Sequence, residues 1–265
     1  MPFVNVNGLK TFYESKGKGR PLILIHGATG SSLYWGIQLS ELSKKLRVIA
    51  IDLPGHGKTE RLKEKATIER YAHHIAAFMK QIKLDKAVIA GHSMGGLVVQ
   101  QLALKHPELF EKLIIVDSTS HFPEPTENSK QSEVMKNLDD SYRKQPPEEL
   151  AKSIVNGLFS KKTLEKGGLS PLIKYLPMES IYDPSIWIMD FEAGKGVDLR
   201  EKIKDINIPT LIIAGADSVI PNSESRFIQE KIKGSVLEII PDAGHMLMLE
   251  KPEEFNQAVL RFIGV

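Results

Sequence analysis

The chain has 265 residues, of which 42% are hydrophobic and 26% are charged, so it can close a sizeable apolar core and lacks the composition of a disordered protein. Its 35 basic and 33 acidic side chains leave a formal net charge of +2 with no basic block, which argues against nucleic acid as a partner. The absence of cysteine excludes disulfides, a thiolate nucleophile and thiolate metal ligands, so any covalent chemistry must use oxygen or nitrogen.

The first ten residues carry neither a charged leader nor an apolar stretch of signal-peptide length. No later run approaches the roughly 18 apolar residues of a membrane helix. We therefore expect a cytoplasmic protein with no membrane partner.

Two short strand-like runs open the chain, at residues 3–6 and 9–15, and only Asn7-Gly8 separates them. Asn-Gly between such runs is a strong signal for a tight hairpin turn. The sequence therefore predicts an antiparallel pair at the start of the sheet.

Apolar runs then alternate with segments of helical period, as in parallel sheets with crossover helices. The runs are apolar nearly throughout, which is typical of strands buried on both faces. The predicted strands are residues 21–25, 46–51, 87–90, 113–116, 210–214 and 236–240, and the predicted helices are residues 33–45, 68–82, 94–105, 223–231 and 253–262. The expected fold class is α/β, with a mostly parallel central β-sheet flanked by helices.

One long interval, from Ser118 to Ile208, breaks this alternation with helical pattern and repeated proline and glycine. We interpret residues 119–205 as a helical cap, or lid, inserted over the carboxyl edge of the sheet. Residues 1–118 and 206–265 then form the core domain. Most apolar side chains of the predicted cap are expected to dock it onto the core, and the others to line a substrate cavity.

The pattern Gly91-His92-Ser93-Met94-Gly95 stands between a predicted strand and a predicted helix. A G-x-S-x-G motif in that setting turns so sharply that the serine hydroxyl projects above the sheet, and its glycines relieve crowding in the turn. A glycine-rich turn without catalysis is the alternative. The strand–turn–helix context favours Ser93 as a nucleophile.

A serine hydroxyl needs a general base to take its proton, and histidine titrates in the useful range. His245 follows the last predicted strand and precedes the last helix, so it should lie at the same edge of the sheet as Ser93. His26 and His56 also fall near that edge, but glycine-flanked turns and loop hydrogen bonds account for them. Solvated surface positions are expected for His73, His74, His106 and His121.

The base in turn needs a carboxylate that fixes its tautomer. Asp217 is the predicted acid because it follows a strand and precedes Pro221, which gives the chain order serine, acid, histidine. Asp117, at the end of another predicted strand, is a rival whose carboxylate could reach the same histidine. Asp242 is expected to serve its turn.

The glycine-rich turn at residues 26–30, with the sequence HGATG, follows another predicted strand. Such a turn can aim backbone amides at developing negative charge. We assign the oxyanion hole to the backbone amides of Ala28 and Met94. A phosphate-binding loop is the alternative, but the turn has neither G-x-G-x-x-G nor G-x-x-x-x-G-K-[ST].

Together these motifs resemble the α/β-hydrolase superfamily, over essentially the whole chain outside the predicted cap. The matching stretches are residues 26–30, 52–57, 91–96, 217–221, 244–245 and 250–255. By this resemblance, residues 52–57 form a structural turn near the site. One departure is that Gly215 precedes Asp217 by two residues where the family often has three, which shifts weight toward Asp117.

The resemblance implies a serine hydrolase of the carboxylesterase-like kind, which cleaves a small to medium apolar ester through an acyl-enzyme and needs no metal or organic cofactor. An enol-lactonase or a carbon–carbon bond hydrolase using the same triad is the alternative. A cofactor-free haloperoxidase (perhydrolase) and a non-catalytic ligand receptor are less favoured. Dehalogenases and epoxide hydrolases of this family use an aspartate at the elbow, so Ser93 argues against both. The expected partner is a small-molecule, ester-like substrate, and the expected state is a monomer or homodimer.

Overall fold

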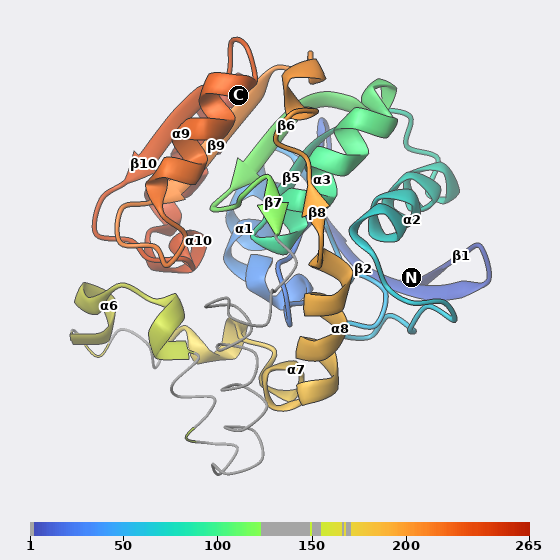
Figure 1. The fold of residues 1–265 in the computed structure, drawn as a ribbon, viewed down its shortest axis with the longest axis horizontal. Coiled ribbons are helices and arrows are strands. Elements are labelled where there is room, and N and C mark those ends of the chain that lie inside the picture. The colour runs from blue at the N-terminus through green and yellow to red at the C-terminus, as the bar shows by residue number, and fades with distance from the viewer. Residues whose placement is uncertain (1–2, 123–148, 150–154, 166, 168–170) are drawn as a thin grey trace.

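The computed structural model describes residues 3–122, 149, 155–165, 167 and 171–265. An eight-stranded sheet forms its centre, in the order β1-β2-β4-β3-β5-β6-β9-β10 (Figure 1). The strands are β1 (Phe3–Val6), β2 (Leu9–Lys16), β3 (Pro21–Ile25), β4 (Arg47–Ile51), β5 (Ala87–His92), β6 (Phe110–Val116), β9 (Thr210–Gly215) and β10 (Val236–Ile240). Strands β4, β3, β5, β6, β9 and β10 pair in parallel, while β2 pairs antiparallel with both β1 and β4. The predicted α/β class with a mostly parallel sheet is confirmed.

The turn between β1 and β2 has the backbone that its sequence predicts. Asn7 and Gly8 have φ values of 51° and 89°, and the Gly8 amide donates to Asn5 Oδ1 at 2.7 Å. Positive φ at both central residues matches the right-handed twist of the flanking strands. The predicted hairpin is therefore confirmed.

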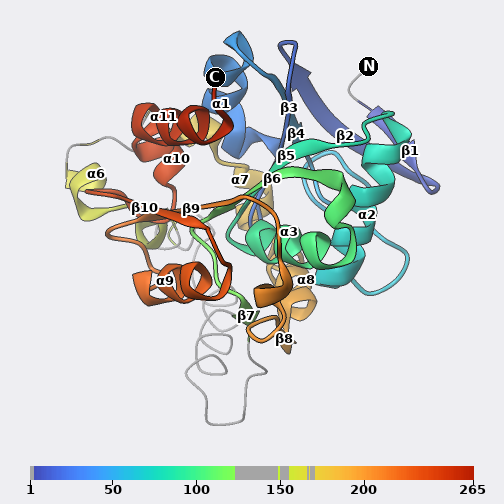
Figure 2. The same ribbon diagram turned by 90° about the horizontal axis from the view of Figure 1, so that it is seen from above.

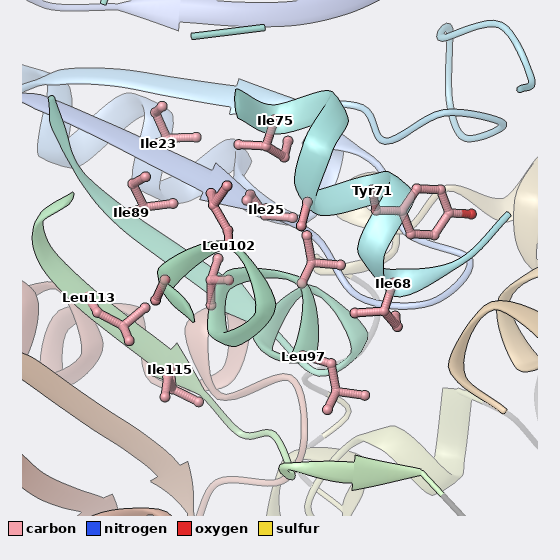
Figure 3. Close-up of a cluster of buried hydrophobic side chains, with 14 of the residues drawn as sticks. Ile23, Ile25, Ile68, Tyr71, Ile75, Ile89, Leu97, Leu102, Leu113 and Ile115 are labelled. Atoms are coloured by element: carbon pink, nitrogen blue, oxygen red, sulfur yellow. The ribbon is translucent and has the colours of Figure 1, made fainter. Parts of the chain in front are cut away.

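Helices cover both faces of the sheet (Figure 2). Helices α2 (Ile68–Gln81), α3 (Met94–Lys105) and α9 (Asn222–Lys231) pack on one face, and α1 (Gly36–Glu41), α10 (Leu247–Glu250) and α11 (Pro252–Ile263) pack on the other. Each face buries alternate residues of the same strands. In Figure 3, Ile23 and Ile25 of β3 point toward α2, while Leu22 and Leu24 belong to the core of the opposite face. This two-residue period explains why the central strands are apolar throughout.

Two predicted elements differ from the structure. The helix predicted at residues 33–45 is divided into η1 (Ser32–Trp35), α1 and η2 (Leu42–Lys44), because Ser31 accepts a hydrogen bond from the Leu33 amide and starts a short 3₁₀ turn before the α-helix. Strand β10 was expected to be buried on both faces. It is one of the two edge strands, paired only with β9, and Val236 is 48% exposed.

Between β6 and β9 the chain leaves the central sheet. A short strand near the start of this segment pairs with a short strand near its end. The described elements are β7 (His121–Phe122), α6 (Lys161–Glu165), η4 (Ile173–Tyr175), α7 (Met178–Tyr182), α8 (Pro184–Gly194), β8 (Val197–Asp198) and η5 (Ile203–Asp205). Strands β7 and β8 pair antiparallel, and α6, α7 and α8 gather at one end of the molecule (Figure 1). Residues 123–148, 150–154, 166 and 168–170 of the predicted cap lie outside the described residues, and its boundaries stay a prediction.

Several apolar side chains of this segment dock on the core. Phe159, Leu176 and Ile181 are buried in the hydrophobic cluster that also contains α10 and α11 residues. Ile173 and Ile188 are instead exposed. Docking therefore accounts for part of the apolar pattern of the segment.

His74 on α2 was expected at the surface and is only 7% exposed, in contact with Thr11 Oγ1 at 3.1 Å. Burial lowers the pKa of His74 to about 4. Its amphipathic helix turns this residue toward β1 and β2, so the surface prediction is wrong.

We expect this buried imidazole to make the fold acid-sensitive. Its contribution to stability is unaffected above pH ~6.5 and declines as the pH falls toward about 4, because the unfolded chain then binds a proton that the folded chain rejects. Urea unfolding of the wild type and of His74→Gln should therefore diverge over this range, by roughly 3 kcal/mol at most. A difference in unfolding free energy that stays constant between pH 7 and 4 would contradict this.

Candidate active site

Ser93 occupies a sharp turn between β5 and α3, with φ 54° and ψ −119°. Such a backbone costs a non-glycine residue about 1–3 kcal/mol, so its surroundings must hold it there. The Ser93 amide donates to Val116 O at 3.0 Å, and the Ser93 carbonyl accepts from the Gly96 amide at 2.8 Å and from Ser118 Oγ at 2.7 Å. The backbone of the turn is thus fixed on both sides of a half-buried serine.

Glycines allow three chain segments to meet at this turn. A Cβ on Gly91 would lie 2.1 Å from Gly95 O, and one on Gly95 would lie 2.4 Å from His26 O. A Cβ on Gly27 would lie 2.8 Å from the Cβ of Ser93. The turn at residues 26–30 therefore packs directly on the serine elbow, which brings the chain near Ala28 beside the start of α3.

His245 lies between β10 and α10 and is only 6% exposed. The neighbouring residue of Ser93, His92, donates from Nε2 to the His245 carbonyl at 2.9 Å, and the two imidazole centroids are 4.5 Å apart. Burial, together with the nearby His245, holds the pKa of His92 well below its usual value. A neutral His92 therefore links the loop of His245 to the elbow, so the two segments predicted to converge are adjacent.

The carboxylate that contacts this imidazole is Asp117, at the end of β6. His245 Nδ1 donates to Asp117 Oδ2 at 2.5 Å. Asp117 is 1% exposed and has a φ of 43°. Its Oδ1 accepts from the Gly215 amide at 3.1 Å, and its Oδ2 also accepts from the Ser218 hydroxyl. Three donors therefore surround one buried carboxylate and satisfy its two oxygens.

The sequence-based choice of Asp217 as the partner of His245 is corrected by this geometry. The side chain of Asp217 is exposed, and its amide donates to Ala243 O at 2.9 Å. The Ala216 amide likewise donates to Ile240 O, so the short loop after β9 first continues along β10. The missing residue between Gly215 and Asp217 was the signal: in the structure the short loop leaves this carboxylate exposed, and it brings the Ser218 hydroxyl to Asp117 instead.

The turn at residues 26–30, which carries the predicted oxyanion donor Ala28, is closed by a bond from the Gly30 amide to Gly27 O at 3.1 Å. His26 donates from Nδ1 to Gly27 O at 2.7 Å and accepts from the Leu53 amide on Nε2 at 3.0 Å. Both ring nitrogens of His26 therefore make hydrogen bonds in the neutral form. Burial, and to a smaller extent the charge of His56, holds the pKa of His26 well below its usual value. His26 is thus a structural residue, as its glycine-flanked turn predicted.

The neighbouring turn at residues 52–57 is tied to the same region. Asp52 accepts from the Ser32 amide at 2.6 Å and from the Lys58 amide at 2.9 Å. His56 in this turn contacts Asp190 of α8, a residue that sequence reasoning did not single out. Asp190 lies in a helix of the predicted cap, where no motif distinguishes it from an ordinary surface carboxylate.

Within the described ranges, no group of three or more histidine, aspartate or glutamate side chains is placed to hold a metal ion. In the same part of the chain, every helix is too short or too polar to cross a lipid bilayer.

Comparison with known proteins agrees with the α/β fold. A sequence model of the α/β-hydrolase fold matches residues 20–252. The chain is 31% identical to 2-hydroxy-6-oxo-6-(2'-aminophenyl)hexa-2,4-dienoic acid hydrolase of Metapseudomonas resinovorans, over 99% of this chain and 90% of that protein. It resembles the solved structure of a hydrolase from Pseudomonas aeruginosa PA01 with a TM-score of 0.86 and 25% identity, covering 99% of this chain and 98% of the other. A thermophilic esterase from Thermogutta terrifontis gives a TM-score of 0.84 and 25% identity, covering 100% and 97%. The chain therefore belongs to the α/β-hydrolase family.

Proposed function

We propose that this protein is a serine hydrolase that cleaves a carboxylic ester, with Ser93 as nucleophile, His245 as general base and Asp117 as the acid of the triad. The observation that carries the proposal is the hydrogen bond from His245 Nδ1 to Asp117 Oδ2, in a loop that His92 ties to the serine elbow. A proton held on Nδ1 leaves Nε2 as the basic nitrogen, which is the form that a serine hydroxyl requires.

In the proposed reaction, Ser93 Oγ attacks the ester carbonyl while His245 Nε2 accepts the hydroxyl proton. The tetrahedral intermediate collapses, its C–O bond to the alcohol breaks, and His245 gives its proton to the leaving alkoxide. Water, deprotonated by the same imidazole, then attacks the acyl-enzyme, and Ser93 leaves with the proton from His245. Asp117 stays ionised throughout and stabilises each imidazolium.

The amides of Ala28 and Met94 are the proposed donors to the oxyanion. The close approach of Gly27 to Ser93 supports this, because it brings the segment of Ala28 to the first residue of α3. Losing one such donor typically lowers the rate by about 10² to 10³.

Residues 119–205 are proposed to form the cap over the acyl and alcohol groups. In support, Phe159 and Leu176 are buried in the same hydrophobic cluster as Met246, which follows the proposed base. The proposed substrate is a small to medium apolar ester, and the mechanism uses no cofactor.

The similarity to a solved esterase favours ester hydrolysis, whereas the 31% identical relative is named as a hydrolase of a dienoic acid and favours carbon–carbon bond cleavage. A substrate panel separates the two: aryl esters of graded acyl length, an enol lactone and a vinylogous diketone acid. We expect the highest kcat/KM for one of the esters. A diketone acid or lactone preferred more than tenfold over every ester would replace the proposal with the corresponding alternative.

Removal of the nucleophile tests the mechanism directly. Ser93→Ala should lower hydrolysis of a short-chain aryl ester by at least about 10⁴, because no oxygen remains to form the acyl-enzyme. The thermal midpoint should stay close to that of the wild type. Ser223→Ala, at an exposed serine of α9, is the control and should keep full activity. Activity of Ser93→Ala within tenfold of the wild type would refute the assignment.

The two aspartates can be told apart by matched substitutions. Asp117→Asn should lower kcat about 10³- to 10⁴-fold, since an amide neither holds the correct tautomer nor stabilises the imidazolium. It should also move the low-field proton resonance of His245 Nδ1 upfield. Asp217→Asn should leave the resonance unchanged and kcat within about threefold of the wild type.

Reversed outcomes would return the acid role to Asp217. If Asp217→Asn loses as much activity as Asp117→Asn, then the loop after β9 must move during turnover to bring its carboxylate to His245.

A further inference from the structure

A buried carboxylate of α8 contacts the turn that carries the proposed oxyanion donor. Asp190 is 4% exposed, and its Oδ2 accepts a hydrogen bond of 2.7 Å from the Thr29 amide, the residue after Ala28. The two residues are 161 positions apart in the chain. A side chain from the segment between β6 and β9 thus completes the hydrogen bonding of a turn in the core.

The same carboxylate contacts His56, whose Nε2 lies 3.0 Å from it. His56 Nδ1 faces Pro54 O at 3.2 Å, so both ring nitrogens face acceptors and both must carry a proton. Burial lowers the pKa of His56, but the charge of Asp190 and its hydrogen bond outweigh burial, and the pKa is raised overall. His56 and Asp190 are therefore a buried ion pair.

The hydrogen bond from Thr29 to Asp190 matters because of the backbone conformation of Thr29. Thr29 has a φ of 52°, a conformation that a β-branched residue adopts only when its neighbours enforce it. Its amide belongs to the peptide that follows Ala28, so the bond to Asp190 fixes one side of Ala28. The bond from the Gly30 amide to Gly27 O closes the turn on the other side.

Docking of α8 does not itself require this buried charge. Exposed contacts already join the helix to the core: Lys65 pairs with Glu192 at 2.7 Å, and Arg61 donates to Ser185 Oγ at 2.8 Å. A buried ion pair is moreover weak as a source of stability, because desolvation offsets much of its attraction. The position of Asp190 is better explained by what it does to the turn at residues 26–30.

We propose that Asp190 is a positioning residue: from α8 it holds the Thr29 amide and thereby sets the direction of the Ala28 amide toward the oxyanion. The oxyanion hole is then fully formed only when α8 is docked on the core. This inference rests on the proposed function. It assigns to the predicted cap a part in the chemical step, in addition to enclosing the substrate.

Steady-state kinetics on an aryl ester can test the role. Asp190→Ala should lower kcat by about 10- to 100-fold with KM within about threefold, because the oxyanion hole acts in the transition state and small misplacements have large effects. Asp190→Asn should recover kcat to within about fivefold, since its amide oxygen can accept from Thr29 while its NH₂ donates to a neutral His56. Glu192→Gln, on the same helix and in an exposed ion pair with the core, is the matched control and should match the wild type.

Asp190→Ala leaves a buried imidazolium without its partner, so it can lose stability for that reason alone. The double variant His56→Leu with Asp190→Leu removes both charges and still lacks an acceptor for Thr29. It should unfold near the wild-type temperature, keep the low-field proton resonance of His245 Nδ1, and show the same loss of kcat. An intact resonance with a lowered kcat places the defect in the oxyanion hole rather than in the base.

Three results would overturn the inference while leaving the proposed function in place: full kcat in both Asp190→Ala and the double variant, a loss in Asp190→Asn equal to that in Asp190→Ala, or a raised KM at unchanged kcat. The last would assign Asp190 to the shape of the pocket. Wild-type turnover that does not depend on Ser93 would instead overturn the proposed function, and the inference with it.

Discussion

Three consecutive residues at the end of β6 hold the two sides of the candidate site together. Val116 O accepts from the Ser93 amide at 3.0 Å, the Asp117 carboxylate accepts from His245 Nδ1 at 2.5 Å, and Ser118 Oγ donates to the Ser93 carbonyl at 2.7 Å. The end of one central strand therefore positions both the serine elbow and the histidine loop. Because that strand pairs with β5 on one side and β9 on the other, its end can move little. Preorganised catalysis requires that the reacting groups be held in fixed positions in this way.

With the carboxylate at the end of β6, the loop after β9 has the role of supplying hydrogen-bond donors to it. That loop contributes two donors to Asp117, from the Gly215 amide and the Ser218 hydroxyl, while its own Asp217 points to solvent. A second carboxylate turned inward beside Asp117 would raise the energy of the charged state of both. Donors on this loop therefore suit an acid at the end of the neighbouring strand, and the exposed position of Asp217 avoids such repulsion.

The sequence predicted those parts of the structure that depend on local pattern. The hairpin at Asn7-Gly8, the parallel strands and the elbow at Ser93 each have a short-range signal, and the hairpin and the strands are confirmed. The choice between Asp117 and Asp217 had only a weak signal, the short spacing between Gly215 and Asp217, because both aspartates follow buried strands that end at the same edge. Only the register of a loop one residue short decides which carboxylate reaches His245. Long-range contacts such as that of Asp190 with Thr29 leave no local pattern at all.

Among the contacts between the core and the segment that joins β6 to β9, two involve a carboxylate next to the proposed catalytic groups. On the side of the oxyanion turn, Asp190 accepts from the Thr29 amide. On the side of the base, Glu250 accepts from the Gly244 amide at 2.8 Å, next to His245, and from the Ser160 amide at 2.9 Å. The segment therefore contacts the core next to the proposed oxyanion donor, Ala28, and next to the proposed base, His245. Since a hydrogen bond to a carboxylate is strongly directional and stronger than one between neutral groups, displacement of the segment would loosen the oxyanion turn and the base together.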